Sequence, residues 1–339
     1  MKSSDCSASL HGFLNLHKPP GPTSQQVVAQ IRRVVASKVG HCGTLDPPAA
    51  GVLPLCLGAA TRLSDFLHRF PKGYEFQAVF GIDTTTLDAE GEVTARRPQP
   101  SLSRSDLESI LPRFRGEVRQ IPPAVSAIHY HGRRLYQLAR RGEPVDPPPR
   151  TVSIHRLRLL SFHPGEFPTG RLEVLCSCGT YIRSLCRDIG EALGCPAHVS
   201  HLVRTRVGSF RLEHSISLET AVREAEDGNL QRHVIPPQRA GLGIITLCVE
   251  EDVAYEIAHG NEVTLSTPPP EAPSWPPPQN GSGARWLLVE NPLGSVLALC
   301  EIVPAEVRYS PSAPAESEGE TLLLRPRKVL LGAAGSASP

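Results

Sequence analysis

The chain has 339 residues, 40% of them hydrophobic and 20% charged, which is enough for two domains and a buried core. Its 35 basic and 34 acidic residues leave a formal net charge of +1, which excludes a uniformly basic nucleic-acid binder. No apolar run approaches about 20 residues, so a membrane-spanning helix is also excluded. Residues 1–10 hold no long apolar stretch and are expected to be a flexible leader, in a cytoplasmic protein with reduced cysteines.

The N-terminal part of the chain predicts a strand, a rigid turn and a helix. Residues 12–16 form a short apolar strand, and the segment KPPGPTS over residues 18–24 is a turn stiffened by prolines. Thr23 or Ser24 is placed to cap the helix that follows. Apolar residues then recur at helical spacing from Val27 to Val35, and Gly40 is the expected stop.

One acidic residue, Asp46, lies in a stiff and mostly apolar loop over residues 40–54, GHCGTLDPPAAGVLP. Two glycines in this loop permit tight turns, and three prolines fix the φ angle. A carboxylate held in such a loop is a candidate for chemistry. The other interpretation is an ordinary turn in which Asp46 caps its own loop.

The next part of the chain alternates between helices and strands. Two amphipathic helices are predicted from apolar residues at 63, 66, 67 and 70 and at 107, 110, 111 and 114. Residues 74–81 alternate as in a strand that begins at Tyr74. The segment TTTLDAEG over residues 84–91 predicts a loop.

Residues 113–158 carry ten arginines against three acidic residues, a local balance of +7 in a nearly neutral chain. Tyr130, His131 and Tyr136 are interleaved with these charges. Such a combination suits contacts to RNA phosphates and sugars. The alternative is a charged surface that faces only solvent.

A strand over residues 172–176 is followed by GTYIR at 179–183, which opens a helix with apolar residues at 182, 185, 189 and 193. The segment HLVRTRVG at 201–208 closes the core. Cys176, Cys178, Cys186 and Cys195 invite comparison with a zinc site. Their spacing argues against one, because C-x-C on a strand points its two side chains to opposite faces.

The C-terminal third predicts a second, smaller domain rich in strands. Residues 236–245 are expected to be a linker, and residues 246–331 hold several short apolar runs of strand type. Residues 267–284 are rich in Pro, Ser and Gly and predict a disordered insertion. Residues 310–320 and the tail 332–339 are expected to be disordered as well.

Over roughly residues 12–211 the chain resembles the TruB family of pseudouridine synthases. The strings that carry the resemblance, in chain order, are KPPGPTS, GHCGTLDPPAAGVLP, TTTLDAEG, QIPPAVSA, GRRLYQLARRG and GTYIR. The resemblance implies an α+β catalytic domain over residues 11–235, built around a mixed, largely antiparallel sheet. It also implies, less specifically, that residues 246–331 are a β-rich RNA-binding domain of the PUA type.

The implied reaction is the isomerisation of uridine to pseudouridine in RNA, without a metal or other cofactor. Asp46 would act on the nucleoside, by attack at C1′, by addition to the base or by proton removal. The residues that match catalytic positions of the family are Asp46, Arg183 and Tyr74, and those that match substrate-binding positions are His41, Tyr181, Leu202 and Lys18.

Each of these residues also has an ordinary structural interpretation. Arg183 would otherwise be a surface arginine of a helix, Tyr74 a core residue of a strand, and His41 a loop histidine bonded to its own turn. By the resemblance Arg183 instead pairs with Asp46, Tyr74 stacks on the base, and His41 fills the place of a flipped nucleotide.

The match to the family is incomplete at Pro48, Ala50 and Cys178, where Leu, Thr and Lys are usual. The segment 132–142 matches the stand-alone branch, so the expected partner is the T-arm of tRNA, modified at the T-loop uridine called position 55. No protein partner is expected, and the chain should be a monomer. Two other hypotheses are a guide-RNA-dependent synthase and a non-catalytic RNA-binding or tRNA-folding protein.

Overall fold

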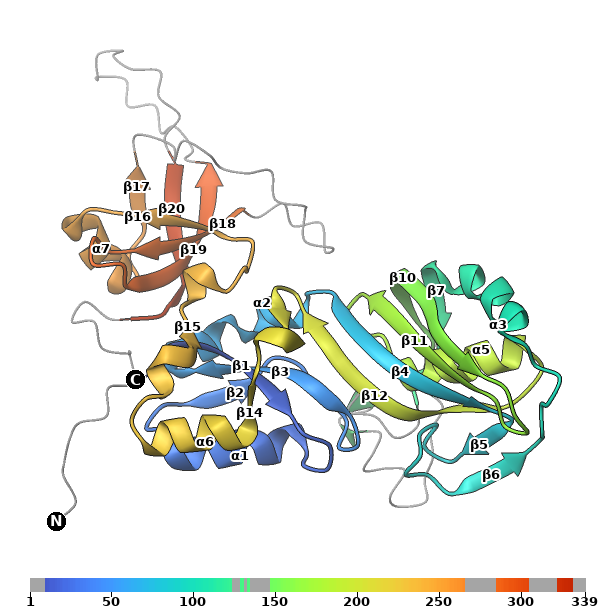
Figure 1. The fold of residues 1–339 in the computed structure, drawn as a ribbon. Helices are drawn as coiled ribbons and strands as arrows, with labels where there is room; N and C mark the ends of the chain where they lie inside the picture. Colours follow the sequence, from blue (N-terminus) through green and yellow to red (C-terminus); the bar gives the residue numbers. More distant parts are fainter. Residues whose placement is uncertain are drawn as a thin grey trace.

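A computed structural model describes residues 10–123, 129–130, 133–134, 147–265, 285–304 and 322–331. Figure 1 shows a long, twisted main sheet with helices packed against it and a smaller sheet near one of its ends. The main sheet is mixed and its pairings are mostly antiparallel. The α+β fold class predicted from the sequence is therefore confirmed.

The main sheet runs through both halves of the catalytic part of the chain. Its strands in spatial order are β14 (Ile216–Ser217), β1 (Gly12–Lys18), β3 (Ala50–Leu57), β12 (Ala197–Val207), β4 (Lys72–Phe80), β11 (Thr169–Cys176), β10 (Arg150–His163) and β7 (Gly116–Gln120). Three short strands pair at its margins, namely β2 (Val39–His41) with β3, β13 (Phe210–Arg211) with β12, and β15 (Val234–Ile235) with β1. Two separate hairpins are formed by β5 (Ile82–Thr84) with β6 (Val93–Arg96) and by β8 (His129–Tyr130) with β9 (Arg133–Arg134).

The two halves of the main sheet meet where β3 runs parallel to β12, with Gly51 opposite Arg204. A Cβ atom on Gly51 would lie 2.2 Å from the carbonyl oxygen of Arg204, and the φ angle of Gly51 is +112°. Both facts require glycine at this position. The close approach brings the loop that precedes β3, which carries Asp46, against the middle of β12.

Helices α1 (Ser24–Val34) and α6 (Leu218–Glu226) lie side by side in Figure 1 and pack on the part of the sheet formed by β1 and β3. Thr23 caps α1 in a capping box with Gln26, as the polar residues of the turn predict. The helix ends at Val34 and does not continue to Gly40, because residues 39–41 are drawn into β2 beside β3.

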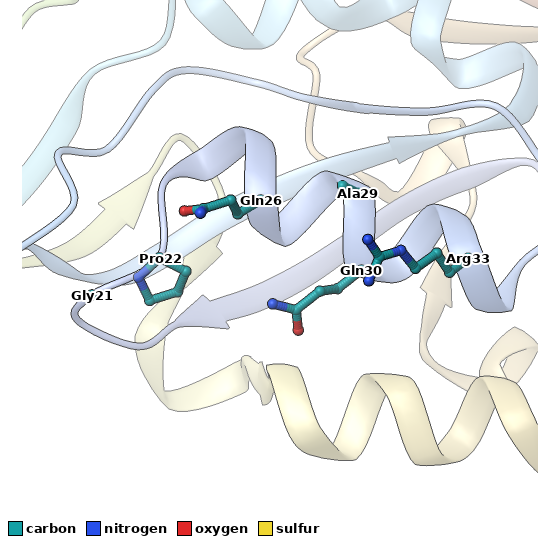
Figure 2. Close-up of a pocket in the computed structure, with 6 residues that line it drawn as sticks. All are labelled: Gly21, Pro22, Gln26, Ala29, Gln30 and Arg33. Atoms are coloured by element: carbon teal, nitrogen blue, oxygen red, sulfur yellow. The ribbon is translucent and has the colours of Figure 1, made fainter.

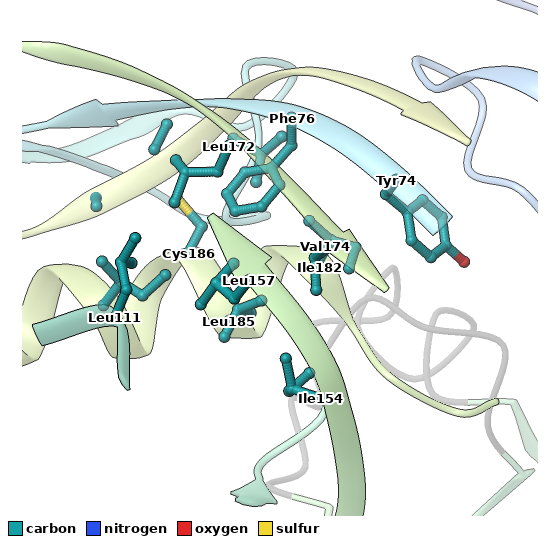
Figure 3. Packing of buried hydrophobic residues seen from close by; sticks show 14 of the residues in the cluster. Tyr74, Phe76, Leu111, Ile154, Leu157, Leu172, Val174, Ile182, Leu185 and Cys186 are labelled. Carbon is teal, nitrogen blue, oxygen red and sulfur yellow. The ribbon is translucent and has the colours of Figure 1, made fainter. Parts of the chain in front are cut away.

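Helix α5 (Ile182–Ala192) covers the other half of the sheet, and its apolar face is fully buried. Figure 3 shows Leu185 and Cys186 of this helix among Phe76 and Leu172 of strands β4 and β11. The helix begins at Ile182, with Tyr181 at its N-cap, within the GTYIR string that predicted its start.

The remaining helices of the main body are short. Both predicted amphipathic helices are interrupted, since η1 (Gly58–Leu63) precedes α2 (Ser64–His68) and α3 (Arg104–Ile110) gives way to η2 (Leu111–Phe114). In the second case Pro112 has no N–H to continue the α-helical hydrogen bonds. Three further 3-10 turns are η3 (Leu212–His214), η4 (Leu230–His233) and η5 (Pro237–Arg239).

The second sheet contains the strands of the C-terminal part in the order β16 (Ile245–Cys248), β18 (Arg285–Glu290), β19 (Val296–Pro304), β20 (Leu322–Val329) and β17 (Val263–Leu265), with α7 (Glu251–Ala258) packed on it. One of its contacts with the main body is made by Trp286. The ring of Trp286 lies edge-on to that of Phe66, with the two ring centroids 5.8 Å apart. Residues 236–245, expected to be a linker, are packed: Ala240 and Leu242 are buried in a cluster that includes residues of both sheets.

Several predicted segments lie outside the described residues. They are the leader up to residue 9, most of the Arg-rich stretch between residues 124 and 146, the insertion 267–284, residues 310–320 and the tail 332–339. The limits predicted for the two domains stay predictions.

Candidate active site

The loop that carries Asp46 joins β2 to β3 and is fixed from the side of α1 by two residues. Leu45 donates its N–H to Ser24 Oγ at 2.9 Å, and that hydroxyl group donates back to the Leu45 carbonyl at 3.0 Å. Gly21 donates its N–H to the Pro47 carbonyl at 2.8 Å. These bonds fall on both sides of Asp46, so the backbone that carries its carboxylate is held in place before any substrate binds.

Lys18 ends β1 beneath the same loop and is completely buried. Its ammonium group donates to the carbonyl oxygens of Pro19, Pro47 and Ala49 at 2.9, 3.0 and 2.7 Å. An ammonium group has three donors, so these contacts use all of them. Lys18 therefore holds the loop in this structure, and the substrate contact expected from the sequence stays a prediction. Burial lowers the pKa of Lys18 to about 8, and the nearby Asp46 opposes this shift.

Arg183 reaches the carboxylate of Asp46 from the first turn of α5. Its Nη2 lies 2.9 Å from Asp46 Oδ2, and its Nη1 lies 3.4 Å from Asp88 Oδ2. The side chain of Arg183 is 6% exposed, whereas that of Asp46 is 38% exposed. Arg183 is thus a buried cation between two carboxylates and not a surface arginine, while Asp46 stays open to an incoming substrate.

Asp88 is part of this site and was not singled out from the sequence. Its Oδ1 accepts hydrogen bonds from the Thr86 hydroxyl group at 2.5 Å and from the Glu90 N–H at 3.2 Å, and the side chain is nearly buried. Leu87 beside it has a φ of 60°, a conformation that side chains other than Gly, Asn and Asp rarely adopt. The loop geometry thus orients Asp88 toward Arg183. The TTTLDAEG string predicted a loop, but it did not predict that Asp88 would contact Arg183.

A small cavity of about 30 Å³ opens beside the Asp46 carboxylate. The residues that line it are Asp46, Pro48, Ala49, Asp88, Ala89, Arg183, Val199, Ser200 and Leu202. Leu202, which was expected to bind the substrate, is among these lining residues.

Tyr74 lies on β4, opposite Arg204 of β12, and is 7% exposed. Figure 3 shows its ring at the end of the apolar cluster, with the hydroxyl group directed away from Phe76 and Val174. Burial raises the pKa of Tyr74 to about 12, so its phenol stays neutral at physiological pH. Tyr74 is not among the described residues that line the small cavity, although it lies in the same core cluster as Leu45 and Ala49 of the loop.

His41 and Tyr181, which were expected to bind the substrate, are both half-buried. His41 ends β2, opposite Leu55, five residues before Asp46. The backbone of Tyr181 is held by Gln120, whose amide accepts from the Tyr181 N–H at 3.0 Å and donates to its carbonyl at 3.1 Å. Neither residue lines the small cavity among the parts of the chain that are described.

A larger cavity of about 500 Å³ lies elsewhere, along the exposed side of α1. Figure 2 shows Gln26, Gln30 and Arg33 of the helix around it, with Gly21 and Pro22 at one end. It contains no acidic side chain among its lining residues, so its size does not make it the reaction site. The paired charges of Asp46 and Arg183 mark the smaller cavity instead.

The described residues contain no group of three or more His, Cys, Asp or Glu side chains placed to hold a metal ion. Within the same residues, no helix has both the length and the apolar character needed to cross a membrane.

The fold and the paired charges of Asp46 and Arg183 beside a cavity are those of a candidate enzyme active site. The family models identify the class of enzyme. Residues 32–182 match the TruB family pseudouridylate synthase N-terminal domain, and residues 183–241 match the tRNA pseudouridylate synthase B C-terminal domain. The chain belongs to the TruB family of pseudouridine synthases, as its motifs predicted.

Curated relatives match most of the chain. The tRNA pseudouridine synthase B of Pseudomonas aeruginosa (strain UCBPP-PA14) is 43% identical over 298 residues, which cover 87% of this chain and 92% of that protein. The protein of the same name from Moorella thermoacetica is 39% identical over 322 residues, covering 94% of this chain and 99% of that one. The same fold occurs in a solved Cbf5-Nop10-Gar1 complex, with a TM-score of 0.65, 25% identity and coverage of 97% of this chain and 88% of that chain.

Proposed function

We propose that this enzyme converts uridine to pseudouridine in tRNA, at the T-loop uridine called position 55. The observation that carries the proposal is the half-exposed carboxylate of Asp46, aimed by the buried Arg183 at 2.9 Å. The names of the relatives, which match this chain at about 40% identity over most of its length, point to tRNA as the substrate.

The isomerisation asks little of the protein beyond this carboxylate and a place to hold the base. The N1–C1′ bond breaks, C5 bonds to C1′, and the proton that leaves C5 is balanced by one gained at N1. No oxidant, metal or other cofactor enters this balance. An ionised carboxylate serves each of the three roles open to Asp46, and the Arg183 guanidinium holds that carboxylate in place at 2.9 Å.

The uridine has to leave its stack to reach Asp46, since its reacting atoms are shielded inside a folded arm. Leu202 then provides an apolar wall for the free base, and Tyr74 a flat surface at the end of β4. His41, which leads into the loop from β2, takes the place that the base has vacated. Tyr181 supports the same substrate from the start of α5.

Arginines of the 113–158 segment hold the RNA backbone in this proposal. In the described part, Arg156 and Arg158 both form ion pairs with Glu173, and Arg115 donates to the Leu157 carbonyl at 3.0 Å. Their guanidinium groups are therefore partly engaged within the protein, which lowers the charge available to RNA. The remaining arginines of the segment that lie within the described residues are Arg113, Arg119, Arg133, Arg134 and Arg150.

The enzyme acts alone and as a monomer, on the T-arm of tRNA in the cytoplasm. Identity to the curated enzymes is 43% for the first relative, against 25% for the chain in the Cbf5-Nop10-Gar1 complex, which favours the stand-alone branch over the guide-RNA-dependent one. The half-exposed Asp46 argues against a protein that only binds or folds RNA.

The test compares full-length tRNA with a synthetic T-arm hairpin, each treated with excess purified protein in a single turnover. Pseudouridine is expected in both at similar rates, and binding should weaken steeply as salt rises. A hairpin that stays inert while full tRNA reacts means that recognition extends beyond the arm. If both stay inert until a guide RNA is added, the stand-alone proposal is wrong.

A further inference from the structure

A second buried arginine, Arg204 of β12, lies behind the Asp46 loop, and the reaction as proposed makes no use of it. The residue is 1% exposed. Its Nη2 donates to the Gly43 carbonyl at 3.0 Å, and its Nη1 to the Thr44 carbonyl at 3.1 Å. Its Nε donates to the Val52 carbonyl at 2.7 Å. One side chain therefore ties the arm of the loop that precedes Asp46 to the arm that follows it.

Arg204 carries a buried charge that forms no ion pair with a carboxylate among the described residues. All three of its nitrogens donate to carbonyl oxygens, whereas Arg183 forms ion pairs with two carboxylates. Burying a cation without a carboxylate is costly, and an apolar residue would fill the same space without that cost. The charge and the planar shape are thus retained at a place where they serve the backbone of the loop.

The same guanidinium also interacts with the side chain of Tyr74, which lies opposite Arg204 in the ladder between β4 and β12. On the other side, Gly51 approaches the backbone of Arg204 so closely that any side chain would collide with it. Arg204 is therefore a shared support for the catalytic loop and for the tyrosine of the base-binding surface.

We propose that Arg204 is a positioning residue that sets the distance and the angle of Asp46 relative to Tyr74. It does not touch the substrate, and it acts through the carbonyls of Gly43, Thr44 and Val52. A guanidinium group donates in several directions from one plane, so it can hold both arms of a loop at once. A lysine keeps the charge but is a point donor at the end of a flexible chain, and it cannot keep the three contacts in their present geometry.

The test rests on the proposed function for its kinetic part, and it compares Arg204→Lys with a matched control, Arg206→Lys. Arg206 lies two residues further along β12 and donates to the Gly208 carbonyl, outside the loop. Single-turnover rate at saturating enzyme, affinity for the T-arm hairpin and thermal unfolding are measured for both variants and for Arg204→Gln.

For Arg204→Lys we expect the rate to fall by about 10- to 100-fold, as for a small misplacement of a reacting group. The affinity for the hairpin should stay within a factor of about two of the wild-type value, because Arg204 affects the chemical step that follows binding. Arg206→Lys should keep the wild-type rate. A rate for Arg204→Lys that equals the control, or that falls only as far as the folded fraction does, overturns the proposal.

Hydrogen exchange of the loop peptides over residues 40–54 tests the same inference without any activity. Faster exchange confined to this loop in Arg204→Lys, and absent in Arg206→Lys, is expected. This result stands even if the wild-type enzyme leaves the hairpin unmodified, which would contradict only the proposed function. Unchanged loop exchange, or failure of both Arg204 variants to fold, would assign Arg204 to general stability and overturn its positioning role.

Discussion

The Asp46 loop and the C-terminal sheet are attached to the main body by different kinds of contact. The loop is held by hydrogen bonds to its backbone from Lys18, Ser24 and Arg204. The C-terminal sheet rests mainly on an apolar cluster, against which Trp286 and Phe66 pack, with only a few polar contacts such as that of Lys328 with Asp65. Directional bonds fix where atoms lie, whereas apolar burial stabilises without fixing a position so closely.

Because of this difference, substitutions in the two regions are expected to have different effects. A change in the loop or in its supports should alter the rate of the chemical step while leaving the fold largely intact. A change at the contact with the C-terminal sheet should alter stability and RNA affinity while the chemical step stays close to normal. Each prediction below tests one side of this separation.

The largest effect is expected for Asp46→Asn. The amide keeps the shape of the side chain but has no charge, so the reaction loses the carboxylate that all three possible roles require. We expect the single-turnover rate to fall by at least about 10³-fold with unchanged thermal unfolding. Appreciable turnover by the pure variant would remove Asp46 from the chemistry.

Arg183→Lys should reduce the rate by about 10²- to 10³-fold, comparable to the loss of one aimed electrostatic donor. Lysine cannot reach Asp46 and Asp88 together as a planar fork does. The matched control is Arg187→Lys on the next turn of α5, which removes an arginine paired with Asp188 at 2.7 Å outside the cavity. Similar rates for the two variants would show that only the charge of Arg183 matters for the reaction, and not the planar shape of its guanidinium group.

Lys18 makes the loop sensitive to pH. Above its lowered pKa of about 8 it loses one of the donors that hold the loop carbonyls, so the rate should decline as pH rises through about 8. Lys18→Met should be about tenfold slower, a modest misplacement, and should lack this decline. Lys72→Met is the control, because burial lowers the Lys72 pKa to about 8 as well, while its contacts go to His68 and Phe70 outside the loop.

The effect of Lys18 on the stability of the fold changes with pH in the opposite direction to its effect on the rate. The folded protein binds the Lys18 proton less tightly than the unfolded chain, so this residue destabilises the fold at neutral pH. That cost disappears as pH rises from about 8 toward 10.5. Activity that tracks stability across this range, in place of opposing it, would contradict the assigned role of Lys18.

The smallest effect on chemistry is expected at the contact of the two sheets. Trp286→Ala removes the edge-on contact with Phe66 and should lower the free energy of unfolding by about 2 kcal/mol, less than for a fully buried tryptophan. The rate at saturating enzyme should change by less than about twofold, since the loop supports are intact. Tyr255→Ala, at a residue 57% exposed on α7, is the neutral control. A large loss of rate in Trp286→Ala would show that the two regions are coupled.

The sequence predicted the pair Asp46 and Arg183 because each lies in a string with family resemblance. It did not predict Asp88 as their neighbour, since the contact joins residues 95 positions apart in the chain and leaves no local pattern. The hydrogen bonds from Lys18 to the loop were not predicted either. The burial of Lys18 depends on how the loop folds back over β1, which composition and spacing do not specify.

The fold shows the same division between local and long-range information. The capping box of α1 and the alternation of β4 are local patterns, and the structure has both. The early end of α1 at Val34 was missed because the pairing of β2 with β3 overrides the helical spacing of the preceding residues. The burial of Ala240 and Leu242 was not predicted, because these residues pack against a sheet whose strands come later in the sequence.

The central claim is that this chain alone modifies one tRNA uridine through Asp46. The most direct measurement maps pseudouridine along an entire unmodified tRNA after treatment with the purified protein and no other macromolecule, in parallel with Asp46→Asn. The account predicts one new pseudouridine, at position 55 of the T-loop, with the wild-type protein and none with the variant. Pseudouridine at other positions only, no pseudouridine at all, or equal modification by Asp46→Asn would contradict it.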